Sequence, residues 1–292
     1  MDSRGILYFL NCGGRRGDKH GLLLFTAIDS LRRIGGYHGQ VLICCGNEEA
    51  VNTAELVSVR DSRGPTSWEK VDFDPEKAKC YAAKTNMGDW SPFEQTIYTD
   101  TDTLWVDGMG DQFWANDKAM VLTQFADWTF SGKKTRGRIA KWREFEPEMV
   151  DLALSSQFSH FPSINTGCLS WRHDCKIFEP WKAICEKDPM QFIADESAMM
   201  VLMPSFLHDW TWVSSRFNWS PIHDKTPLKD AACCHGHGGK FFSREQGQDV
   251  WVPYFLTCYG ENRLGIREYL ARHSHLMPEL IEISKRFGGV KG

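Results

Sequence analysis

The chain has 292 residues, of which 42% are apolar and 25% are charged, a composition typical of a folded globular protein rather than a disordered one. The formal net charge of −4 argues against a protein that coats nucleic acid or an anionic membrane over its whole surface. The first apolar run, at 6–10, is too short for a signal-peptide core or a membrane span, so we expect a soluble, cytoplasmic protein.

The first hundred residues alternate strand-like and helix-like segments. Short apolar runs predict strands, and longer segments with apolar residues at helical spacing predict helices. Strands are expected at 6–11, 41–45, 68–73 and 96–99, and helices at 22–34, 48–60 and 75–85. This alternation is typical of an α/β protein whose parallel sheet is covered by helices on both faces.

The rest of the chain is less regular. We expect a strand at 164–171, helices at 174–186 and 195–203, a tryptophan-rich stretch at 210–219 and a helical region from Glu261 onward. The sequence has no internal repeat and no low-complexity linker. One α/β domain with a less regular second lobe is therefore the simplest prediction.

Two carboxylates follow the strand expected at 96–99. Asp100 and Asp102 are separated only by Thr101, and ligands of open α/β sheets bind beyond the carboxyl ends of the strands. Both carboxylates can face one hard cation there, and Mg²⁺ or Mn²⁺ fits best. A metal bridging the phosphates of a nucleotide diphosphate stabilises the charge that this leaving group gains as a glycosidic bond breaks. The motif thus indicates metal-dependent binding of a nucleotide-sugar.

A second group of candidate ligands lies late in the chain, in the segment 234–240, Cys-His-Gly-His-Gly-Gly-Lys. It combines imidazoles that can bind a metal, glycines that let the backbone approach a phosphate, and a cation. A glycine-rich surface loop would have the same composition. The segment therefore indicates a ligand site only when it is considered together with the acidic motif.

Six basic residues gather around Trp142. They are Lys133, Lys134, Arg136, Arg138, Lys141 and Arg143. A solvated loop that leads into a helix explains them, and the alternative is a mobile basic flap over phosphates or over a nucleic-acid acceptor.

These motifs occur in the order found in GT-A glycosyltransferases. The matching segments are Lys84-Thr85, Ser91-Pro92-Phe93, the run 97–104, the run 164–167, Asp195-Glu196 and the late His-Gly-Lys segment. The chain most resembles glycosyltransferase family 8, which includes glycogenin and bacterial galactosyltransferases, by motifs spread over about 5–242. The resemblance implies a GT-A fold with a Rossmann-like, mostly parallel central sheet flanked by helices. It implies one catalytic domain, 1–292, with a nucleotide-sugar-binding half at 1–125 and an acceptor-side half with the C-terminal helices at 126–292.

The resemblance also implies a metal site made of both motif aspartates and a late histidine. In the family, glycine follows the histidine by three positions, which fits His235 and Gly238, and lysine follows three positions later. Here Lys240 comes one position early and Phe-Phe replaces the usual Pro-Trp, so His237 stays a rival ligand. The candidate metal ligands are Asp100, Asp102, His235 and His237.

Further residues would bind the donor. The turn after the first strand would hold the nucleobase and ribose, two lysines would contact the diphosphate, and the segment at 165–167 would lie beside the donor sugar. The residues so implied are Asn11, Cys12, Gly13, Lys84, Asp100, Thr101, Asn165, Thr166, Gly167, Gly238 and Lys240.

Asp195 and Glu196 resemble the acidic segment of the family beside the reacting sugar, so they are the candidate catalytic residues. Asp195 would bind donor hydroxyls. Glu196 could act as a general base on the acceptor hydroxyl, which gives inversion, or stabilise an oxocarbenium-like transition state on the way to retention. A pair of acids that complements the dipole at a helix start is the structural alternative.

Two other functions stay open. A sugar-phosphate nucleotidyltransferase shares the sheet and the metal requirement, and it normally carries a glycine-rich basic loop after its first strand, which 13–17 superficially resembles. A catalytically silent carbohydrate-binding protein with a GT-A fold is the other. The late His-Gly-Lys segment argues against the first, and the retained aspartates and histidine argue against the second.

The leading hypothesis is a hexosyl- or pentosyltransferase that uses Mn²⁺ or Mg²⁺, a nucleotide diphosphate-sugar donor and a hydroxyl acceptor. The basic segment Lys133–Arg143 allows a nucleic-acid acceptor, such as hydroxymethylated DNA in a virus-encoded pathway in the host cytoplasm. The identity of the donor sugar and the stereochemical outcome stay open.

Overall fold

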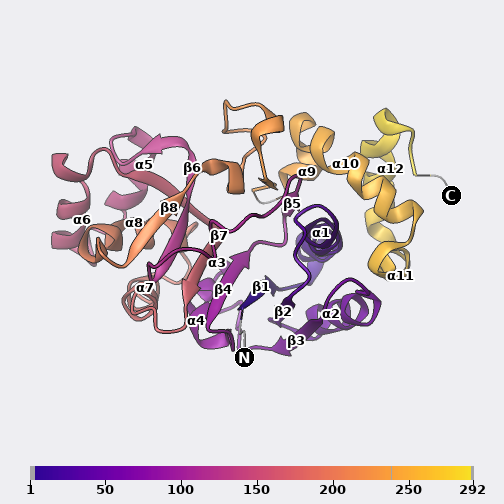
Figure 1. Cartoon of the computed structure of the whole chain (residues 1–292), viewed down its shortest axis with the longest axis horizontal. Coiled ribbons are helices and arrows are strands. Elements are labelled where there is room, and N and C mark those ends of the chain that lie inside the picture. Colours follow the sequence, from indigo (N-terminus) through magenta and orange to yellow (C-terminus); the bar gives the residue numbers. More distant parts are fainter. Residues whose placement is uncertain (1–3, 238, 291–292) are drawn as a thin grey trace. The chain divides into compact units, whose positions relative to one another are not determined.

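The computed structural model describes residues 4–237 and 239–290 (Figure 1). The strands are β1 (Arg4–Leu10), β2 (Gln40–Cys45), β3 (Thr66–Lys70), β4 (Gln95–Thr99), β5 (Thr103–Trp105), β6 (Met120–Thr129), β7 (Pro162–Arg172), β8 (Trp210–Val213) and β9 (Cys233–His235). The helices are α1 (Gly14–Arg33), α2 (Glu48–Arg60), α3 (Cys80–Ala83), α4 (Met87–Trp90), α5 (Lys133–Ala140), α6 (Pro147–Ala153), α7 (Phe178–Cys185), α8 (Ala194–Leu202), α9 (Lys240–Ser243), α10 (Glu245–Gly260), α11 (Ile266–Arg272) and α12 (Met277–Ser284). No helix among these residues is both long and apolar enough to cross a membrane.

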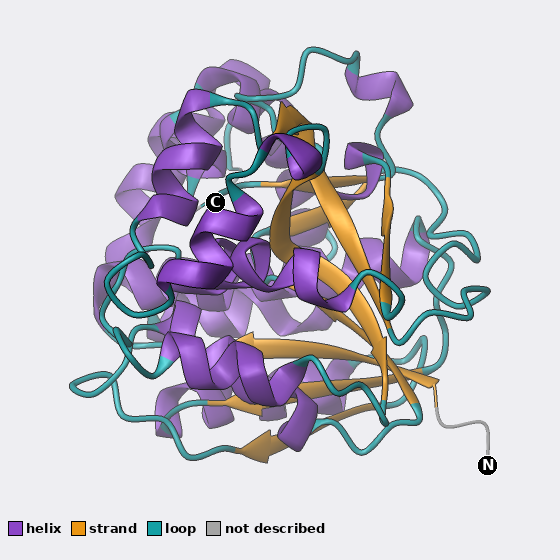
Figure 2. Ribbon diagram, turned by 90° about the vertical axis from the view of Figure 1, so that its left-hand side faces the viewer, coloured by secondary structure: helices purple, strands orange, loops and turns teal. Residues whose placement is uncertain are grey.

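Seven strands form one sheet in the order β3-β2-β1-β4-β7-β6-β8, and β5 and β9 form a separate two-stranded sheet. The pairs β1–β2, β2–β3 and β6–β8 are parallel, whereas β6–β7 is antiparallel. Helices flank the strands (Figure 2). The predicted α/β class with a mostly parallel sheet is confirmed.

The described chain divides into two compact units, which we treat separately. The first unit contains Arg4, Phe73–Tyr98 and Asp111–Asn218. The second unit contains Gly5–Asp72, Thr99–Gly110 and the residues from Trp219 onward.

In the second unit, α1 begins at Gly14, earlier than the helix predicted at 22–34. Its first turns are polar, so they lack the apolar periodicity that reveals a helix in sequence. Ion pairs to Glu279 of α12 hold them instead, from Arg15 at 3.0 Å and from Lys19 at 2.5 Å. Apolar burial becomes continuous only from Gly21 onward.

In the first unit, β7 is buried along almost its whole length. Two fully buried tryptophans pack beside α8 and use their indole N–H groups as donors. Trp142 donates to the Ser197 hydroxyl, and Trp181 donates to the backbone carbonyl of Asp195, both at 2.9 Å. Because buried indole N–H groups need acceptors, these bonds fix the start of α8, where the candidate catalytic acids lie.

Several expectations about local structure were wrong. The helix predicted at 75–85 is reduced to α3 and a following turn of 3₁₀ helix at Lys84–Asn86. The Asp74 carboxylate accepts a hydrogen bond from the backbone N–H of Glu76 at 3.0 Å, and such local bonds compete with helix formation. The helix α10 and the strands β5, β6 and β9 were not predicted.

Candidate active site

The two motif aspartates lie in a tight turn between β4 and β5, in the second unit. The Thr103 hydroxyl donates to the Asp100 carbonyl at 2.7 Å and lies 3.0 Å from the Thr99 hydroxyl. These contacts between residues 99–103 stabilise the conformation of the turn. Asp102 is buried, and the Asp100 side chain is 17% exposed, so one carboxylate of the pair stays accessible.

Strand pairing carries His235 to this turn. In the antiparallel pair β5–β9, Thr103 lies opposite His235. The Gly236 N–H donates to the Asp102 carbonyl at 2.7 Å. His235 Nε2 therefore lies 3.1 Å from Asp102 Oδ1 and 3.4 Å from Asp100 Oδ2. We call Asp100, Asp102 and His235 the acidic–histidine cluster.

The cluster is suited to a divalent cation. Its three ligand atoms all lie within 4.8 Å of one another, and carboxylate oxygens with one imidazole nitrogen are a ligand set that Mn²⁺ accepts. One imidazole faces two carboxylates, and a divalent cation matches the charge of such a pair.

The rival histidine, His237, is not part of this group of ligand atoms. Its ring instead lies against His235, with centroids 4.0 Å apart and planes 31° apart. Its backbone is left-handed, with φ of 42°, a conformation that costs a non-glycine residue energy. Gly238, the next predicted donor residue, lies outside the described residues.

One residue at this turn was missed in the sequence. His20 of α1 places its Nδ1 3.0 Å from the hydroxyl of Thr101. It lies in the polar start of α1, where no motif distinguishes it. It helps to hold the central residue of the Asp-Thr-Asp turn.

The predicted nucleotide loop, Asn11 to Gly13, links β1 to α1. Asn47, at the N-cap of α2, donates to the Cys12 carbonyl, and Gly13 has φ of 115°, which favours glycine. A Cβ on Gly17 would lie 2.8 Å from the Cys12 carbonyl carbon. Glycine at 17 thus lets α1 start close against this loop.

The basic run at 13–17 does not form the loop expected of a nucleotidyltransferase. Residues 14–17 are the first turn of α1, and the Arg15 guanidinium pairs with Glu279. The predicted diphosphate ligand Lys240 begins the short helix α9, after Gly239 with φ of 91°. Its N–H donates to the Gly236 carbonyl at 2.7 Å, which ties α9 to the end of β9.

In the first unit, Asn165 and Glu196 are brought together. Both are buried, and the Asn165 amide donates to Glu196 Oε1. Arg138 of α5 binds the other carboxylate oxygen, Oε2, at 2.9 Å. The side-chain oxygen of Asn165, Oδ1, accepts hydrogen bonds from the Gly167 N–H at 2.9 Å and from the Asn218 amide at 2.6 Å. Both ends of the Asn165 side-chain amide are thus oriented.

Asp195 has its own set of partners. Thr166 donates its hydroxyl to Asp195 Oδ2 at 2.6 Å, and Lys84 Nζ lies 3.5 Å from the same oxygen. Lys84 is itself buried and lies over the ring of Tyr98, 5.4 Å from its centroid. The predicted diphosphate lysine is therefore an ion-pair partner of a predicted catalytic acid within the first unit.

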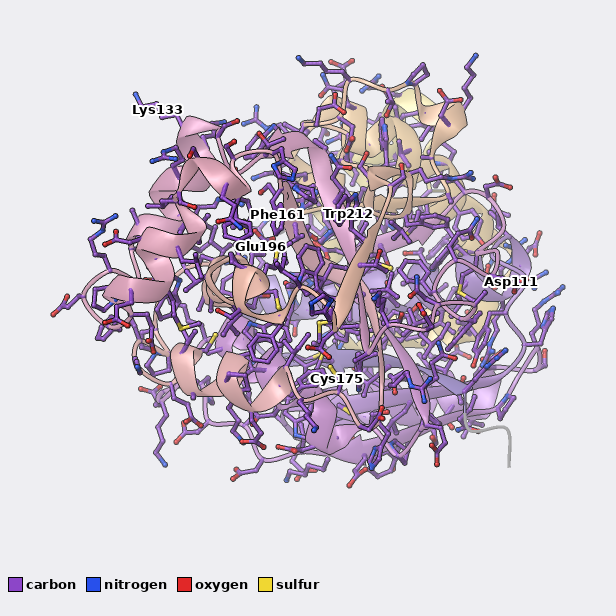
Figure 3. All side chains as sticks on the ribbon, turned by 60° about the vertical axis from the view of Figure 1, so that its left-hand side comes forward. Asp111, Lys133, Phe161, Cys175, Glu196 and Trp212 are labelled. Atoms are coloured by element: carbon purple, nitrogen blue, oxygen red, sulfur yellow. The ribbon has the colours of Figure 1, made fainter. Side chains whose placement is uncertain are left out.

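Arg138 and Asn218 were not predicted as site residues. Arg138 was grouped with the basic segment, whose composition suggested solvent, and nothing marked Asn218 within the tryptophan-rich stretch. Figure 3 shows Lys133 extending outward while Glu196 lies inside the first unit. The basic segment thus contributes both an outward-facing lysine and an inward-facing arginine.

No family model and no curated protein matches the sequence. Solved glycosyltransferase structures match the fold. The galactosyltransferase LgtC, in complex with donor and acceptor sugar analogs, matches over 88% of this chain and 95% of its own, with a TM-score of 0.58 and 16% identity. The glycosyltransferase GlyE of Streptococcus pneumoniae TIGR4 matches over 94% of this chain and 64% of its own, with a TM-score of 0.60 and 13% identity.

Mouse xyloside xylosyltransferase 1, in its apo form, matches over 80% of this chain and 97% of its own, with a TM-score of 0.53 and 10% identity. These matches show that the chain has the GT-A fold that its motifs predicted.

Proposed function

We propose that this protein is a metal-dependent glycosyltransferase that moves a hexose or pentose from a nucleotide diphosphate-sugar to a hydroxyl acceptor. The observation that carries the proposal is the acidic–histidine cluster, in which Asp100, Asp102 and His235 converge after β4 of a GT-A fold. The similarity to structures of galactosyl- and xylosyltransferases supports the same class of reaction.

In this proposal Asp100, Asp102 and His235 hold Mn²⁺ or Mg²⁺. The bound cation would neutralise the charge that the departing nucleotide diphosphate gains. Lys240, in the same unit, would add positive charge for these phosphates, and Lys84 would hold Asp195 in place in the first unit. The loop from Asn11 to Gly13 would receive the nucleobase and ribose, as the glycine backbone at 13 and the helix start after it suit close approach of a flat ring.

Asn165, Thr166 and Asp195 would bind hydroxyls of the donor sugar. All three side chains are buried. Thr166 is hydrogen-bonded to Asp195, and the Gly167 N–H holds Asn165, so their positions are set before a ligand arrives. Binding groups that are already oriented lose little freedom when substrate binds, which favours catalysis.

We assign Glu196 an electrostatic role rather than that of general base. Both of its oxygens already accept hydrogen bonds, from Asn165 and from Arg138. A carboxylate held in this way suits stabilisation of positive charge at the anomeric carbon. Each carboxylate oxygen can accept a second hydrogen bond, so general-base catalysis is the alternative role, and the reaction product tests it.

The anomeric configuration of the transferred sugar distinguishes an electrostatic role of Glu196 from a general-base role. An electrostatic role predicts that the anomeric configuration, read by NMR, is retained and that Glu196→Gln still transfers sugar slowly. A general base contributes about 10²–10⁴-fold. Inverted product together with a loss in that range would instead assign Glu196 as the base.

The acceptor in the proposal is a hydroxyl compound. Hydroxymethylated DNA is a narrower candidate, favoured by the exposed lysines of the basic segment, Lys133, Lys134 and Lys141. Arg136, Arg138 and Arg143 contact other groups of the first unit. Binding to duplex DNA that is absent at low salt, or insensitive to salt, would exclude this candidate.

The proposal is tested by a thermal-shift screen of nucleotide-sugars with and without Mn²⁺, followed by an assay of donor hydrolysis. A true donor raises the melting temperature by mass action, and only with the metal. Asp100→Ala/Asp102→Ala should abolish metal-dependent hydrolysis while the fold stays intact. Hydrolysis that survives this change would show that these aspartates do not bind a catalytic metal.

A separate assay tests the alternative function. Pyrophosphate release from a nucleoside triphosphate and a sugar phosphate would assign the protein as a nucleotidyltransferase.

A further inference from the structure

A second group of metal-competent side chains lies in the second unit, outside the acidic–histidine cluster. Asp18 projects from α1, His273 follows the last residue of α11, and His275 precedes α12. Their ligand atoms all lie within 4.8 Å of one another. Asp18 and His273 are buried, and the side chain of His275 is 49% exposed. We call these three residues the Asp18 cluster.

The distances within the Asp18 cluster match those between ligands of one small cation. Asp18 Oδ2 lies 3.1 Å from His275 Nε2 and 3.7 Å from His273 Nδ1. Zinc bonds of about 2.0–2.1 Å in a tetrahedral arrangement separate neighbouring ligands by about 3.3 Å. The three atoms can therefore converge on one ion with small side-chain adjustments.

The surroundings of His273 are those of a metal ligand. Its second ring nitrogen, Nε2, is buried and lies 3.1 Å from Glu49 Oε1 at the start of α2, at ion-pair distance but without the geometry of a hydrogen bond. A metal-binding histidine usually directs its other nitrogen to a carboxylate, which fixes the ring and raises the basicity of the ligating nitrogen. Tyr269 packs against the imidazole with ring centroids 4.2 Å apart.

The backbone of Asp18 is also held. The Tyr269 hydroxyl donates to the Asp18 carbonyl at 2.6 Å, and a Cβ on Gly21, one turn further along α1, would collide with that hydroxyl at 2.2 Å. Tyrosine, histidine and aspartate are thus positioned by packing before any ion arrives. Such preorganisation is what a built metal site requires.

We propose that Asp18, His273 and His275 form a second divalent-metal site, separate from the acidic–histidine cluster and selective for zinc. Two imidazoles and one carboxylate favour Zn²⁺ over Mg²⁺ or Ca²⁺, which prefer oxygen ligands throughout. Glu49 orients His273 from the second coordination shell.

Zinc at this site would cross-link α1 with the junction of α11 and α12. Side chains of the C-terminal helices contact α1, among them Glu279, which forms two ion pairs with residues of α1. A metal that binds the folded chain and not the unfolded one adds to its stability. The site therefore has a structural role, independent of sugar transfer.

The test compares zinc binding by the wild type, His275→Ala and a matched control, His208→Ala. His208 is an exposed histidine of the first unit, and its backbone carbonyl accepts a hydrogen bond from Lys118. The control therefore changes the same residue type away from the cluster. His275 is half-exposed, which makes its replacement compatible with folding. Each protein is freed of metal and titrated with Zn²⁺ against a chromophoric chelator.

We expect His275→Ala to bind one zinc ion fewer per chain than the wild type and to lose the corresponding rise in melting temperature, while His208→Ala keeps both. Asp102→Asn weakens metal binding by the acidic–histidine cluster. This variant should still bind the zinc ion that His275→Ala loses. Co²⁺ gives a second readout, because tetrahedral coordination produces visible absorption bands that His275→Ala should lose.

Equal zinc binding by His275→Ala and His208→Ala would overturn the proposal and leave the cluster as an ion-pair network of histidines and carboxylates. None of these measurements depends on sugar transfer. A negative result for the zinc site can therefore be distinguished from a negative result for the proposed glycosyltransferase activity.

Discussion

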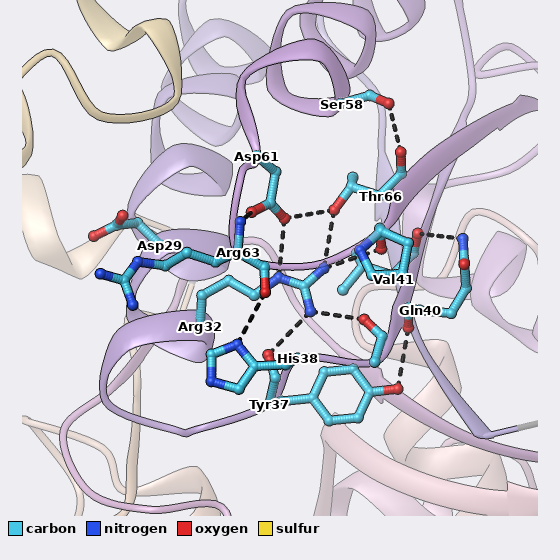
Figure 4. A network of polar contacts seen from close by, with 12 residues as sticks. Asp29, Arg32, Tyr37, His38, Gln40, Val41, Ser58, Asp61, Arg63 and Thr66 are labelled. Atoms are coloured by element: carbon cyan, nitrogen blue, oxygen red, sulfur yellow. Dashed lines mark hydrogen bonds and ion pairs between the residues drawn. The ribbon is translucent and has the colours of Figure 1, made fainter.

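Replacing Arg32 with alanine should destabilise the protein strongly, because this arginine is the centre of a buried polar network in the second unit (Figure 4). The side chains of Arg32 and its ion-pair partner Asp61 are each only 1% exposed, with Nε and Oδ2 2.9 Å apart. The other guanidinium nitrogens donate to the carbonyls of Tyr37, Gly39 and Pro65 and to the hydroxyl of Thr66, at 2.7–3.1 Å.

The magnitude follows from what the substitution leaves behind. Arg32→Ala removes the cation and leaves the Asp61 carboxylate and three carbonyls without their guanidinium donor. Removal of one partner from a buried ion pair costs about 3–5 kcal/mol. The total stability of a folded protein is only about 5–15 kcal/mol. We therefore expect Arg32→Ala to lose a large fraction of its free energy of unfolding.

Urea unfolding followed by circular dichroism measures the loss. Arg60→Ala is the matched control, because it removes an exposed ion pair, to Glu268, from the same unit. Exposed pairs contribute about 0–1 kcal/mol. The double variant Arg32→Ala/Asp61→Ala should lose less than the sum of the two single variants, because no buried charge is left without its partner. A loss by Arg32→Ala no larger than that of Arg60→Ala would refute this reasoning.

Three further predictions concern single side chains. Arg138→Ala should lower the rate of sugar transfer, because Glu196 loses a donor, whereas Lys133→Ala should leave the rate near that of the wild type; equal effects would separate Arg138 from the site. In the native protein, iodoacetamide should label Cys80, which is exposed, before Cys12, because burial raises the pKa of the Cys12 thiol to about 12; the order, read by mass spectrometry, should disappear on unfolding. Burial alone would raise the pKa of Glu279, but hydrogen bonds from two basic residues of α1 outweigh it and lower that pKa. This carboxyl therefore stabilises the fold above its unfolded pKa of about 4.3, and the contribution disappears as the pH falls through the lower folded pKa. Glu279→Gln should make the melting temperature less dependent on pH in that acid range, and an unchanged dependence would contradict the assignment.

The regular parts of the fold could be predicted from sequence because their signals are local. The helix α2 was predicted with its observed bounds, and its N-cap Asn47 accepts a hydrogen bond from the Ala50 N–H at 2.8 Å, as capping chemistry requires. The strands β1 and β2 were found because each is a buried apolar run. The strands β4 and β7 are also buried and were found although polar residues interrupt them. The strands β5 and β9 are three residues long, too short for any periodicity to show.

In the candidate site, too, the features that are local in sequence could be predicted, whereas contacts between distant residues could not. The acidic motif could be located because a strand and two aspartates are adjacent in sequence. The partners of its side chains could not, because tertiary packing decides them. Arg138 lies in a segment whose composition indicates a solvated surface, yet it pairs with Glu196. His273 and His275 lie far along the chain from Asp18, and no spacing rule connects them.

The charges of the two units differ in a way that bears on the proposed reaction. In the first unit each candidate acid faces a cation of the chain itself, Lys84 for Asp195 and Arg138 for Glu196. In the acidic–histidine cluster one imidazole faces two carboxylates. A divalent ion matches that arrangement, whereas in the proposed function the acids of the first unit would bind neutral hydroxyl groups. Metal removal should therefore weaken binding of the nucleotide diphosphate much more than binding of a free sugar. Calorimetry with the two ligands, before and after chelation, compares these losses, and equal losses would show that the metal does not act through the phosphates.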